Sequence, residues 1–540
     1  MINQLVENLA FACLGGQERT GLSETSAFEW IHADLSKELF SYSQVNTYSN
    51  KIANILKNLG ITKGDRVSIF LQRSPELIFS FFAILKNEAV ACLLFSTFGE
   101  SALIDRLNDN GTSLIITKKS LLKKILKIKD ALISLRTILV IDIDEHLDGF
   151  TLSLPKLLSN SPGDFKYTPM IEPDAPAFIQ YTSGSTGKPK GAVHVHGAIS
   201  SIEQSFREVF QIKEEEIYWC TADPAWITGL VYGIVAPMAA NVRQIHFAGN
   251  FNAEHWLNCL QNEKVNVWYT APTALRMLMQ EEEGFFSKFD CSTIKRIYSV
   301  GEPLNPEVYR WAKRIFNCEV YDNFFQSETG SIMIANRPGI PVRPGSMGKP
   351  LNFIEAVILD NKMDSARPGS QGKLCFKKGW PSMFITYLNK PEVYAEKFSG
   401  NYYITGDLAV EDKDGFFWYI SRSDDVINTA GHLVDPFEVE SSLLEIEEIN
   451  DVAVIGAPDA ILHEKIVAYL CLRNNIEWSR ELELKCRLKI SNEISTTAVP
   501  QEYKIVSVIP KNRSGKILRR VLRAWHEGTD PGDLSTLEEQ

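Results

Sequence analysis

The sequence Tyr181-Thr182-Ser183-Gly184-Ser185-Thr186-Gly187-Lys188-Pro189-Lys190-Gly191 combines three glycines, four aliphatic hydroxyl side chains and two lysines within eleven residues. An apolar run, 177–179, precedes it, and an alternating run, 192–196, follows it. Both flanks are typical of strands, so this segment is predicted to be a loop between two strands. Converging backbone N–H groups, hydroxyl donors and ammonium groups are what a polyphosphate needs from a protein. The pattern therefore predicts a phosphate-binding loop.

This loop differs from the Walker A motif, which has four residues between its glycines and a Ser or Thr after its Lys. Here two residues separate Gly184 from Gly187, and Pro189 follows Lys188. A generic Gly/Ser run is more often a solvated loop than a binding site. The two lysines and the flanking strands favour the phosphate-binding interpretation.

The composition is that of a globular protein, with 44% hydrophobic and 23% charged residues among 540. That length predicts two or more domains.

A net charge of −11 argues against non-specific binding to nucleic acid or anionic membranes. Nine cysteines without a CxxC pair predict reduced thiols in a cytoplasmic protein. We expect no signal peptide, and the apolar run 77–85 is too short to cross a membrane.

The order of apolar strands and amphipathic helices predicts an α/β protein with largely parallel sheets. Helical patterns at 42–59, 74–85 and 102–109 alternate with apolar strands at 67–71, 89–94 and 113–117. After about residue 350, short strands separated by Gly and Pro turns predict an antiparallel, barrel-like module. A small α+β pattern follows Asp424, where we place the boundary between domains 1–423 and 424–540.

Three further strands deliver polar or small residues at their C-terminal ends. They run into the segments 270–273, Gly301-Glu302-Pro303 and 322–330. Ligands of open parallel sheets bind at the carboxyl ends of the strands. Three such ends after a phosphate loop predict one shared site.

The chain resembles the adenylate-forming enzymes, which include acyl-CoA synthetases, luciferases and peptide-synthetase adenylation domains. Besides the phosphate loop, five stretches match that family in order and spacing: 301–303, 322–330, 403–407, 422–425 and 513–516. The resemblance covers essentially the whole chain. Within the family, Trp219 to Gly229 and Tyr269 to Thr273 look most like acetyl-CoA synthetases and their short- and medium-chain relatives.

The resemblance implies that a carboxylate attacks the α-phosphate of ATP to give an acyl-adenylate and pyrophosphate, after which the thiol of coenzyme A displaces AMP. Joining two anions needs positive charge and aligned donors rather than a covalent nucleophile. It implies catalytic roles for Lys516, Glu328 and Thr182, with Glu328 holding Mg²⁺, which prefers carboxylate oxygen. Nucleotide binding is implied for Thr182, Ser183, Gly184, Ser185, Thr186, Gly187, Lys188, Lys190, Gly301, Glu302, Pro303, Asp322, Asn323, Phe324, Gln326, Ser327, Asp407 and Arg422.

In the family, the small C-terminal domain is mobile and rotates about a hinge between the two half-reactions. The resemblance places that hinge at Asp424 and carries Lys516 on the moving domain. This is a conformational step of the lid-and-domain kind.

Two departures from the family bear on the substrates. Acetate-specific relatives carry two tryptophans where this chain has Phe324-Phe325, so the pocket that Phe325 shares with Trp226, Ile227, Thr228 and Val300 is expected to be deeper. Acetate, propionate, butyrate or a similar acid is therefore expected. Leu433 stands where many relatives have Arg, which weakens the inference to coenzyme A.

Three functions stay open at this point. The first is an AMP-forming acyl-CoA synthetase for short- to medium-chain acids. The second is an enzyme that loads an acyl group on the phosphopantetheine of a carrier protein. The third is a non-catalytic nucleotide-binding relative, against which Lys516, Glu328 and Asp407 argue. No nucleic-acid partner and no membrane insertion are expected.

Overall fold

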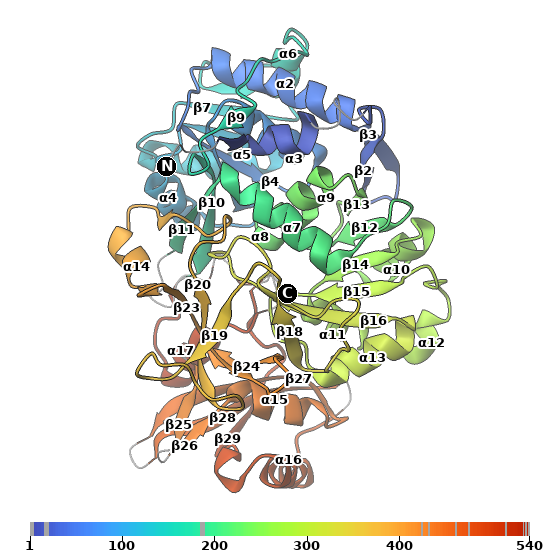
Figure 1. Cartoon of the computed structure of the whole chain (residues 1–540), viewed down its shortest axis with the longest axis vertical. Coiled ribbons are helices and arrows are strands. Elements are labelled where there is room, and N and C mark those ends of the chain that lie inside the picture. Colours follow the sequence, from blue (N-terminus) through green and yellow to red (C-terminus); the bar gives the residue numbers. More distant parts are fainter. Residues whose placement is uncertain are drawn as a thin grey trace.

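The computed structural model describes residues 5–15, 21–183, 189–422, 425–429, 432–459, 462–473, 476–512, 516–532, 534 and 537, without the side chains of Ser183, Glu283 and Leu433. The chain forms a large N-terminal part and a small C-terminal part that packs beneath it in the view of Figure 1. Both are mixtures of helices and strands. The predicted α/β fold with a large and a small domain is thus confirmed.

The first sheet follows the strand order β21-β11-β10-β5-β4-β6-β7-β8. Strands β10 through β8 in this order are parallel, and β11 and β21 join them antiparallel. Its strands are β4 (Arg66–Leu71), β5 (Val90–Phe95), β6 (Leu114–Thr117), β7 (Thr137–Val140), β8 (Thr151–Ser153), β10 (Pro176–Ser183), β11 (Pro189–Val195) and β21 (Thr386–Tyr387). A separate antiparallel pair joins β1 (Val6–Glu7) and β9 (Met170–Ile171).

The helices of this region are α2 (Tyr42–Asn58), α3 (Pro75–Lys86), α4 (Glu100–Asp109), α5 (Lys119–Ile128) and α6 (Leu154–Leu158). Ser41 and Gln44 form a reciprocal capping box that fixes the start of α2. Every residue of α3 except Glu76 is buried. The apolar run 77–85 is therefore covered by the protein core. The lysine-rich helix α5 is solvated on one face only, because Leu121, Leu122 and Ile125 pack into the core.

The second sheet begins as a parallel sheet and continues as the predicted antiparallel module. Its order is β19-β20-β23-β24-β18-β17-β16-β15-β14-β12-β13-β2-β3, with β22 beside β23. The mainly parallel half contains β2 (Ser26–Ile31), β3 (Lys37–Ser41), β12 (Ile217–Cys220), β13 (Arg243–Phe247), β14 (Val267–Thr270), β15 (Arg296–Ser299) and β16 (Glu319–Phe324). The antiparallel half contains β17 (Ile334–Ala335), β18 (Ser346–Pro350), β19 (Ala356–Leu359), β20 (Gln371–Lys377), β22 (Phe398–Ser399), β23 (Tyr402–Glu411) and β24 (Phe417–Arg422).

Among the described residues, eight further α-helices lie between 199 and 395. They are α7 (Ile199–Phe210), α8 (Ile227–Leu230), α9 (Ala236–Ala239), α10 (Ala253–Asn262), α11 (Pro272–Leu278), α12 (Glu283–Phe286), α13 (Pro306–Phe316) and α14 (Pro391–Ala395). Short π- and 3₁₀-helical turns are η1 (Phe11–Gly15), η2 (Lys129–Ala131), η3 (His196–Ala198), η4 (Val231–Val235) and η5 (Thr496–Ala498). None of the helices in the described part of the chain is long and apolar enough to cross a membrane.

The C-terminal part has its own sheet and its own apolar core. The sheet joins β25 (Ile427–Thr429), β26 (His432–Val434), β27 (Ile449–Asp459), β28 (His463–Leu472) and β29 (Glu502–Ile505), and the helices are α15 (Pro436–Leu444), α16 (Arg480–Glu493) and α17 (Arg519–Glu527). Val439, Val454 and Ile466 are among its fully buried residues. A separate core supports an independent domain. The predicted boundary residue, Asp424, lies outside the described residues, so the boundary stays a prediction.

Three local patterns in the sequence differ in extent from the elements that form. The apolar run 505–509 predicts a strand, but the strand that forms is β29, Glu502–Ile505, which pairs in parallel with Val467–Leu470 of β28. Residues 150–176, whose Ser, Pro and Asp content predicts a connection, contain β8, α6 and β9. Ser421 and Arg422, which begin a polar stretch that predicts a break, close strand β24 instead.

Candidate active site

One cavity of about 320 Å³ opens where the two domains meet, and it collects the predicted site residues. Its volume lies at the low end of the range for small-molecule sites. The predicted residues that line it are Thr182, Lys190, Trp226, Ile227, Thr228, Val300, Gly301, Glu302, Pro303, Asp322, Asn323, Phe324, Phe325, Gln326, Ser327, Glu328, Asp407, Arg422 and Lys516. Gly184 to Lys188 and Asp424 lie outside the described residues, as does the side chain of Ser183.

The predicted phosphate loop connects two antiparallel strands of the first sheet. Strand β10 ends at Ser183 and β11 begins at Pro189, and Thr182 lies opposite Lys190 in the ladder. The hydroxyl of Thr182 donates to the carbonyl of Lys190 at 3.5 Å. The Lys190 ammonium lies 5.8 Å from the centre of the Tyr387 ring. Two strands therefore hold both ends of the loop beside the cavity.

Glu328 faces the same end of the cavity. Its Oε1 accepts a hydrogen bond of 2.7 Å from the Tyr387 hydroxyl, which belongs to the short strand β21. Among the described residues, no three His, Cys, Asp or Glu side chains cluster as a metal cage. One carboxylate at a phosphate-binding cavity fits Mg²⁺, which usually takes one or two carboxylates together with substrate phosphates and water.

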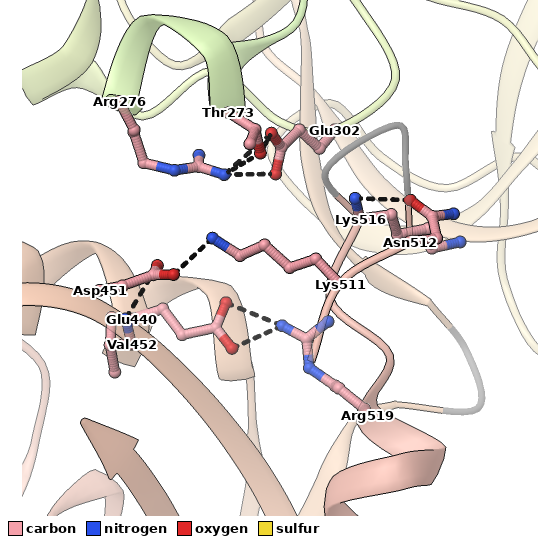
Figure 2. Close-up of polar contacts among 10 residues, drawn as sticks. All are labelled: Thr273, Arg276, Glu302, Glu440, Asp451, Val452, Lys511, Asn512, Lys516 and Arg519. Carbon is pink, nitrogen blue, oxygen red and sulfur yellow. Dashed lines mark hydrogen bonds and ion pairs between the residues drawn. The ribbon is translucent and has the colours of Figure 1, made fainter. Parts of the chain in front are cut away.

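A second wall is built by the segment after β15. Gly301 has φ +95°, a left-handed conformation that favours glycine, and it turns the chain toward the cavity. The next residue, Glu302, is fixed from helix α11 (Figure 2): Nη2 of Arg276 donates to its two carboxylate oxygens at 2.9 and 2.8 Å. Thr273 also donates to Glu302 at 2.5 Å. These bonds hold the Glu302 carboxylate against α11.

The end of β16 supplies a neutral, buried hydrogen-bond network. Ser299 donates to Asp322 at 2.6 Å, and Asn323 donates to the Ser299 carbonyl at 2.9 Å. The Tyr269 hydroxyl donates to Oδ1 of Asn323 at 3.0 Å. Burial raises the pKa of Asp322 from 3.8 to about 7, although the bond from Ser299 partly opposes that rise. Below that pH the Asp322 carboxyl is protonated and neutral.

Asp407 occupies the facing wall, on the antiparallel half of the second sheet. It lies opposite Arg422 in the β23–β24 ladder, and the two side chains approach to 3.5 Å. Gln326 donates to Asp407 Oδ2 at 2.6 Å and accepts a 2.8 Å bond from the Tyr403 hydroxyl. Gly406, with φ +81°, precedes Asp407 and would strain with any side chain. The backbone and Gln326 thus set the direction of the Asp407 carboxylate.

The C-terminal domain contributes Lys516 to the cavity. Its backbone N–H donates to Oδ1 of Asn512 at 2.9 Å. The Lys516 side chain lines the cavity. Desolvation by the surrounding protein lowers its pKa, and the positive charge of Arg422 lowers it further. An ammonium in such a place is a compact charge for an anionic ligand.

Ion pairs within the C-terminal domain hold the segments around Lys516 (Figure 2). Arg519, three residues beyond Lys516, binds both carboxylate oxygens of Glu440 at 2.6 and 2.7 Å. Lys511, five residues before Lys516, binds Asp451 at 2.5 Å. Arg519 is thus bound to a buried carboxylate and is not one of a solvated cluster of tail charges.

The residues predicted to contact the acid line the same cavity as the predicted nucleotide-binding residues. They are Trp226, Ile227, Thr228, Val300 and Phe325. The Phe325 ring packs edge-on against Tyr232 with ring centres 5.3 Å apart. The Trp226 ring lies 4.8 Å from the ring centre of Phe95. These second-layer rings, Tyr232 and Phe95, fix the walls of the pocket.

Several residues around the cavity were missed by the sequence reasoning. Tyr403 lay inside a quoted motif, and Asn512 directly precedes another, so both could have been found. Arg276 and Tyr387 carried no local signal, because their roles come from partners 26 and 59 residues away in the chain. Lys397, which also lines the cavity, is another residue without a local signal. His194 and His196 are buried, and neither lines the cavity.

Comparisons with known proteins agree with this geometry. Residues 23–388 match the family model of AMP-binding enzymes, and residues 438–516 match that of the AMP-binding enzyme C-terminal domain. The acetyl-coenzyme A synthetase of Bacillus subtilis (strain 168) is 41% identical over 93% of this chain and 88% of its own length. That of Pasteurella multocida (strain Pm70) is 37% identical over 98% of this chain and 86% of its own length.

Solved structures give the same relationship. An anthranilate CoA ligase in complex with anthranoyl-AMP superposes with a TM-score of 0.89 at 26% identity, covering 97% of this chain and 98% of that one. An acyl-CoA synthetase from Brucella canis superposes with a TM-score of 0.76 at 27% identity, covering 97% and 95%. By its sequence matches over both domains, this chain belongs to the AMP-binding enzyme family.

Proposed function

We propose that this protein is an AMP-forming acyl-CoA synthetase that activates a short- to medium-chain carboxylic acid with ATP and transfers the acyl group to coenzyme A. The observation that carries the proposal is the single cavity in which Lys516, Asp407 and Glu328 meet the apolar pocket. The relatives named acetyl-coenzyme A synthetase support the thiol acceptor and the substrate class.

In this proposal the nucleotide lies between the two walls. Gly301, Glu302 and Pro303 flank the adenine on one side, and Asp322, Asn323 and Phe324 flank it on the other. Asp407 accepts from the ribose hydroxyls, and Arg422 reaches the ribose or a phosphate. The fixed orientation of Glu302 and Asp407 supports these assignments, because a preorganised site binds without reordering its own side chains.

Phosphate chemistry takes place at the other end. Thr182, the loop 183–188 and Lys190 cradle the β- and γ-phosphates, while Gln326 and Ser327 approach the α-phosphate. Glu328 would hold Mg²⁺, which when bound neutralises phosphate charge. A substrate carboxylate oxygen forms a bond to the α-phosphorus, and the bond from that phosphorus to the bridging oxygen breaks. Lys516 stabilises the negative charge that develops between the two anions.

The acid lies in the pocket of Trp226, Ile227, Thr228, Val300 and Phe325. Each methylene that a pocket accepts or rejects changes selectivity by about 1–3 kcal/mol. A phenyl ring at Phe325 occupies less space than an indole, so we propose that acids longer than acetate are accepted.

The proposal also includes a hinge at Asp424, a mobile domain formed by residues 424–540, and a cytoplasmic location. Nine free cysteines support a reducing compartment.

The experiment that tests the proposal is pyrophosphate release with acids from acetate to octanoate, with and without coenzyme A. We expect multiple turnovers that require one of these acids and coenzyme A, with Phe325→Trp shifting the preference toward acetate by roughly 10-fold. Turnover with an acyl carrier protein but not with coenzyme A would mean that the thiol acceptor is the carrier protein. Nucleotide binding without release for any acid would leave a non-catalytic binding protein.

A further inference from the structure

Lys397 brings a second ammonium to the phosphate end of the cavity, and no sequence motif marked it. It lies in the turn between helix α14 and strand β22, and it lines the cavity together with Lys190 and Glu328. Lys190 comes from the first sheet, whereas Lys397 comes from the antiparallel half of the second sheet. The two lysines therefore approach one region from different parts of the fold.

Among the described residues, neither ammonium forms an ion pair, because no carboxylate oxygen lies within 4.0 Å of Nζ of Lys190 or Lys397. Burial lowers the pKa of Lys190, and the charges of Lys397 and Lys390 lower it further, whereas Glu328 and Glu396 partly oppose that fall. Lys390 also donates to the Pro189 carbonyl at 2.8 Å. Like charges that form no ion pair repel, and a multiply charged anion beside them would relieve that repulsion.

The backbone holds Lys397 in place. Its N–H donates to the carbonyl of Tyr394 at 3.0 Å, and its carbonyl accepts from Ile404 at 2.8 Å. The flanking Tyr394 and Phe398 rings pack edge-on with centres 4.8 Å apart. Ile404 belongs to β23, the strand that carries Asp407. The position of Lys397 is thus coupled to the wall that faces the nucleotide site.

We propose that Lys397 binds the β- and γ-phosphates of ATP and the pyrophosphate that leaves, from the side opposite Lys190. This inference rests on the proposed function and adds a catalytic residue to it. When the bond between the α-phosphorus and the bridging oxygen breaks, the electron pair stays on that oxygen, and pyrophosphate gains a negative charge. Lys397 and Lys190 stabilise that charge, so the two cations clamp the leaving group between the sheets.

The test compares Lys397→Met with a matched control, Lys378→Met. Lys378 is an exposed lysine on the same module whose ammonium lies 5.2 Å from the Phe398 ring centre, and it does not line the cavity. Calorimetric titration of the purified full-length variants with inorganic pyrophosphate and Mg²⁺ measures the site without turnover. We expect Lys397→Met to bind pyrophosphate roughly 10- to 100-fold more weakly, as for loss of one charge-assisted hydrogen bond. AMP binding is expected to stay near that of the control.

Two further measurements distinguish phosphate binding by Lys397 from a structural role. Lys397→Arg keeps the positive charge and should restore most of the pyrophosphate affinity, whereas a packing role would not follow charge. In steady state, Lys397→Met should raise KM for ATP and leave KM for coenzyme A unchanged. An effect on coenzyme A alone would overturn the proposal, because the diphosphate of that thiol would then be the ligand. Equal weakening of AMP and pyrophosphate would also overturn it.

The outcomes distinguish this inference from the proposed function. If the wild type releases no pyrophosphate with any acid, yet Lys397→Met loses pyrophosphate binding, the synthetase proposal falls and the Lys397 assignment stands. If the wild type is an active synthetase and Lys397→Met binds pyrophosphate like the control, the Lys397 assignment is wrong. Thermal unfolding of each variant identifies any that fails to fold. If Lys397→Met does not fold, pyrophosphate binding is compared between Lys397→Arg and the wild type.

Discussion

The two sides of the cavity are held by different kinds of interaction. On the large domain, Asp322 and Asn323 lie at the end of β16 in a network that includes Ser299 and Tyr269, and burial raises the Asp322 pKa to about 7. On the small domain, Glu440 and Arg519 form a buried, charge-assisted pair close to Lys516. The end of β16 relies on strands that a continuous sheet already fixes. The segment around Lys516 relies on charge.

This difference follows from what each segment is attached to. Strand β16 has a parallel neighbour on one side and an antiparallel neighbour on the other, so its backbone hydrogen bonds fix its end. The 510–518 segment that carries Lys516 forms only isolated bridges, such as Lys511–Ile517, among its described residues. Ion pairs to Glu440 and Asp451 anchor it from both ends. The comparison predicts that removing a charge disturbs the segment around Lys516 far more than the end of β16.

The largest effect is expected from Glu440→Gln. This change removes the carboxylate that Arg519 binds at 2.6 Å and leaves it only Asp425, at 3.9 Å, in a site where the Glu440 and Arg519 side chains are 5% and 14% exposed. Breaking one partner of a buried pair costs about 3–5 kcal/mol. Denaturant unfolding that follows the C-terminal domain measures the loss. The control is Glu483→Gln, which breaks a pair with Arg487 that is 38% and 40% exposed and should cost at most about 1 kcal/mol. Similar losses for both variants would contradict the comparison.

The next effect is expected from Lys516→Ala. Removing the ammonium should slow acyl-adenylate formation by roughly 10²- to 10³-fold, the usual cost of losing one group that stabilises developing charge. Transfer of the acyl group from supplied acyl-adenylate to coenzyme A should be nearly unaffected, because the α-phosphate bond has already formed.

Rapid-quench assays of each half-reaction make this measurement. Lys504→Ala removes a 35%-exposed lysine of the same domain and serves as the control. Equal slowing of both half-reactions by Lys516→Ala would show that Lys516 supports the fold of the domain rather than adenylation.

The smallest effect concerns Asp322 and pH. Because its folded-state pKa is raised, the native protein keeps a proton that the unfolded chain loses above about pH 4. Wild-type stability relative to Asp322→Asn should therefore be highest at low pH, fall as pH rises, and level off above about pH 7. Between pH 5 and pH 8 the expected change is about 2–3 kcal/mol.

Urea unfolding of both proteins without ligand, at several pH values, tests this sign. Asp290→Asn is the matched control, because hydrogen bonds from Ser292 lower the pKa of that exposed carboxyl and no change is expected over the same range. A constant difference between wild type and Asp322→Asn across this range would mean that Asp322 is ionised in the native protein. The end of β16 would then carry a charge, as the segment around Lys516 does.

Much of the fold could be predicted from the sequence because its signals are local. Alternation of apolar strands and helices identified α2, α3 and α4 to within a few residues, and Gly-rich turns marked the antiparallel half. The predicted strand ends were wrong where pairing with a neighbouring strand determines them. Ser421 and Arg422 look polar, yet Arg422 extends β24 because it pairs with Asp407 across the ladder.

The site was predictable as a set of positions but not as a set of contacts. Glycines, hydroxyls and strand-end carboxylates indicated a nucleotide site, and the described members of that set do line one cavity. Arg519 could not be separated from a solvated basic tail, because its partner Glu440 lies 79 residues away. Lys397 was missed because only the fold brings it to the cavity that Lys190 and Glu328 line.

The sequence by itself determined the periodicity of the elements, the phosphate loop and the kinds of side chain at the strand ends, because these depend on neighbours along the chain. Only the tertiary structure decided which carboxylates are protonated or paired, and which lysines reach the cavity. Burial and charge depend on groups brought together from distant segments: Asp322 is buried with Ser299, Arg276 holds Glu302, and Lys397 lines the same cavity as Lys190.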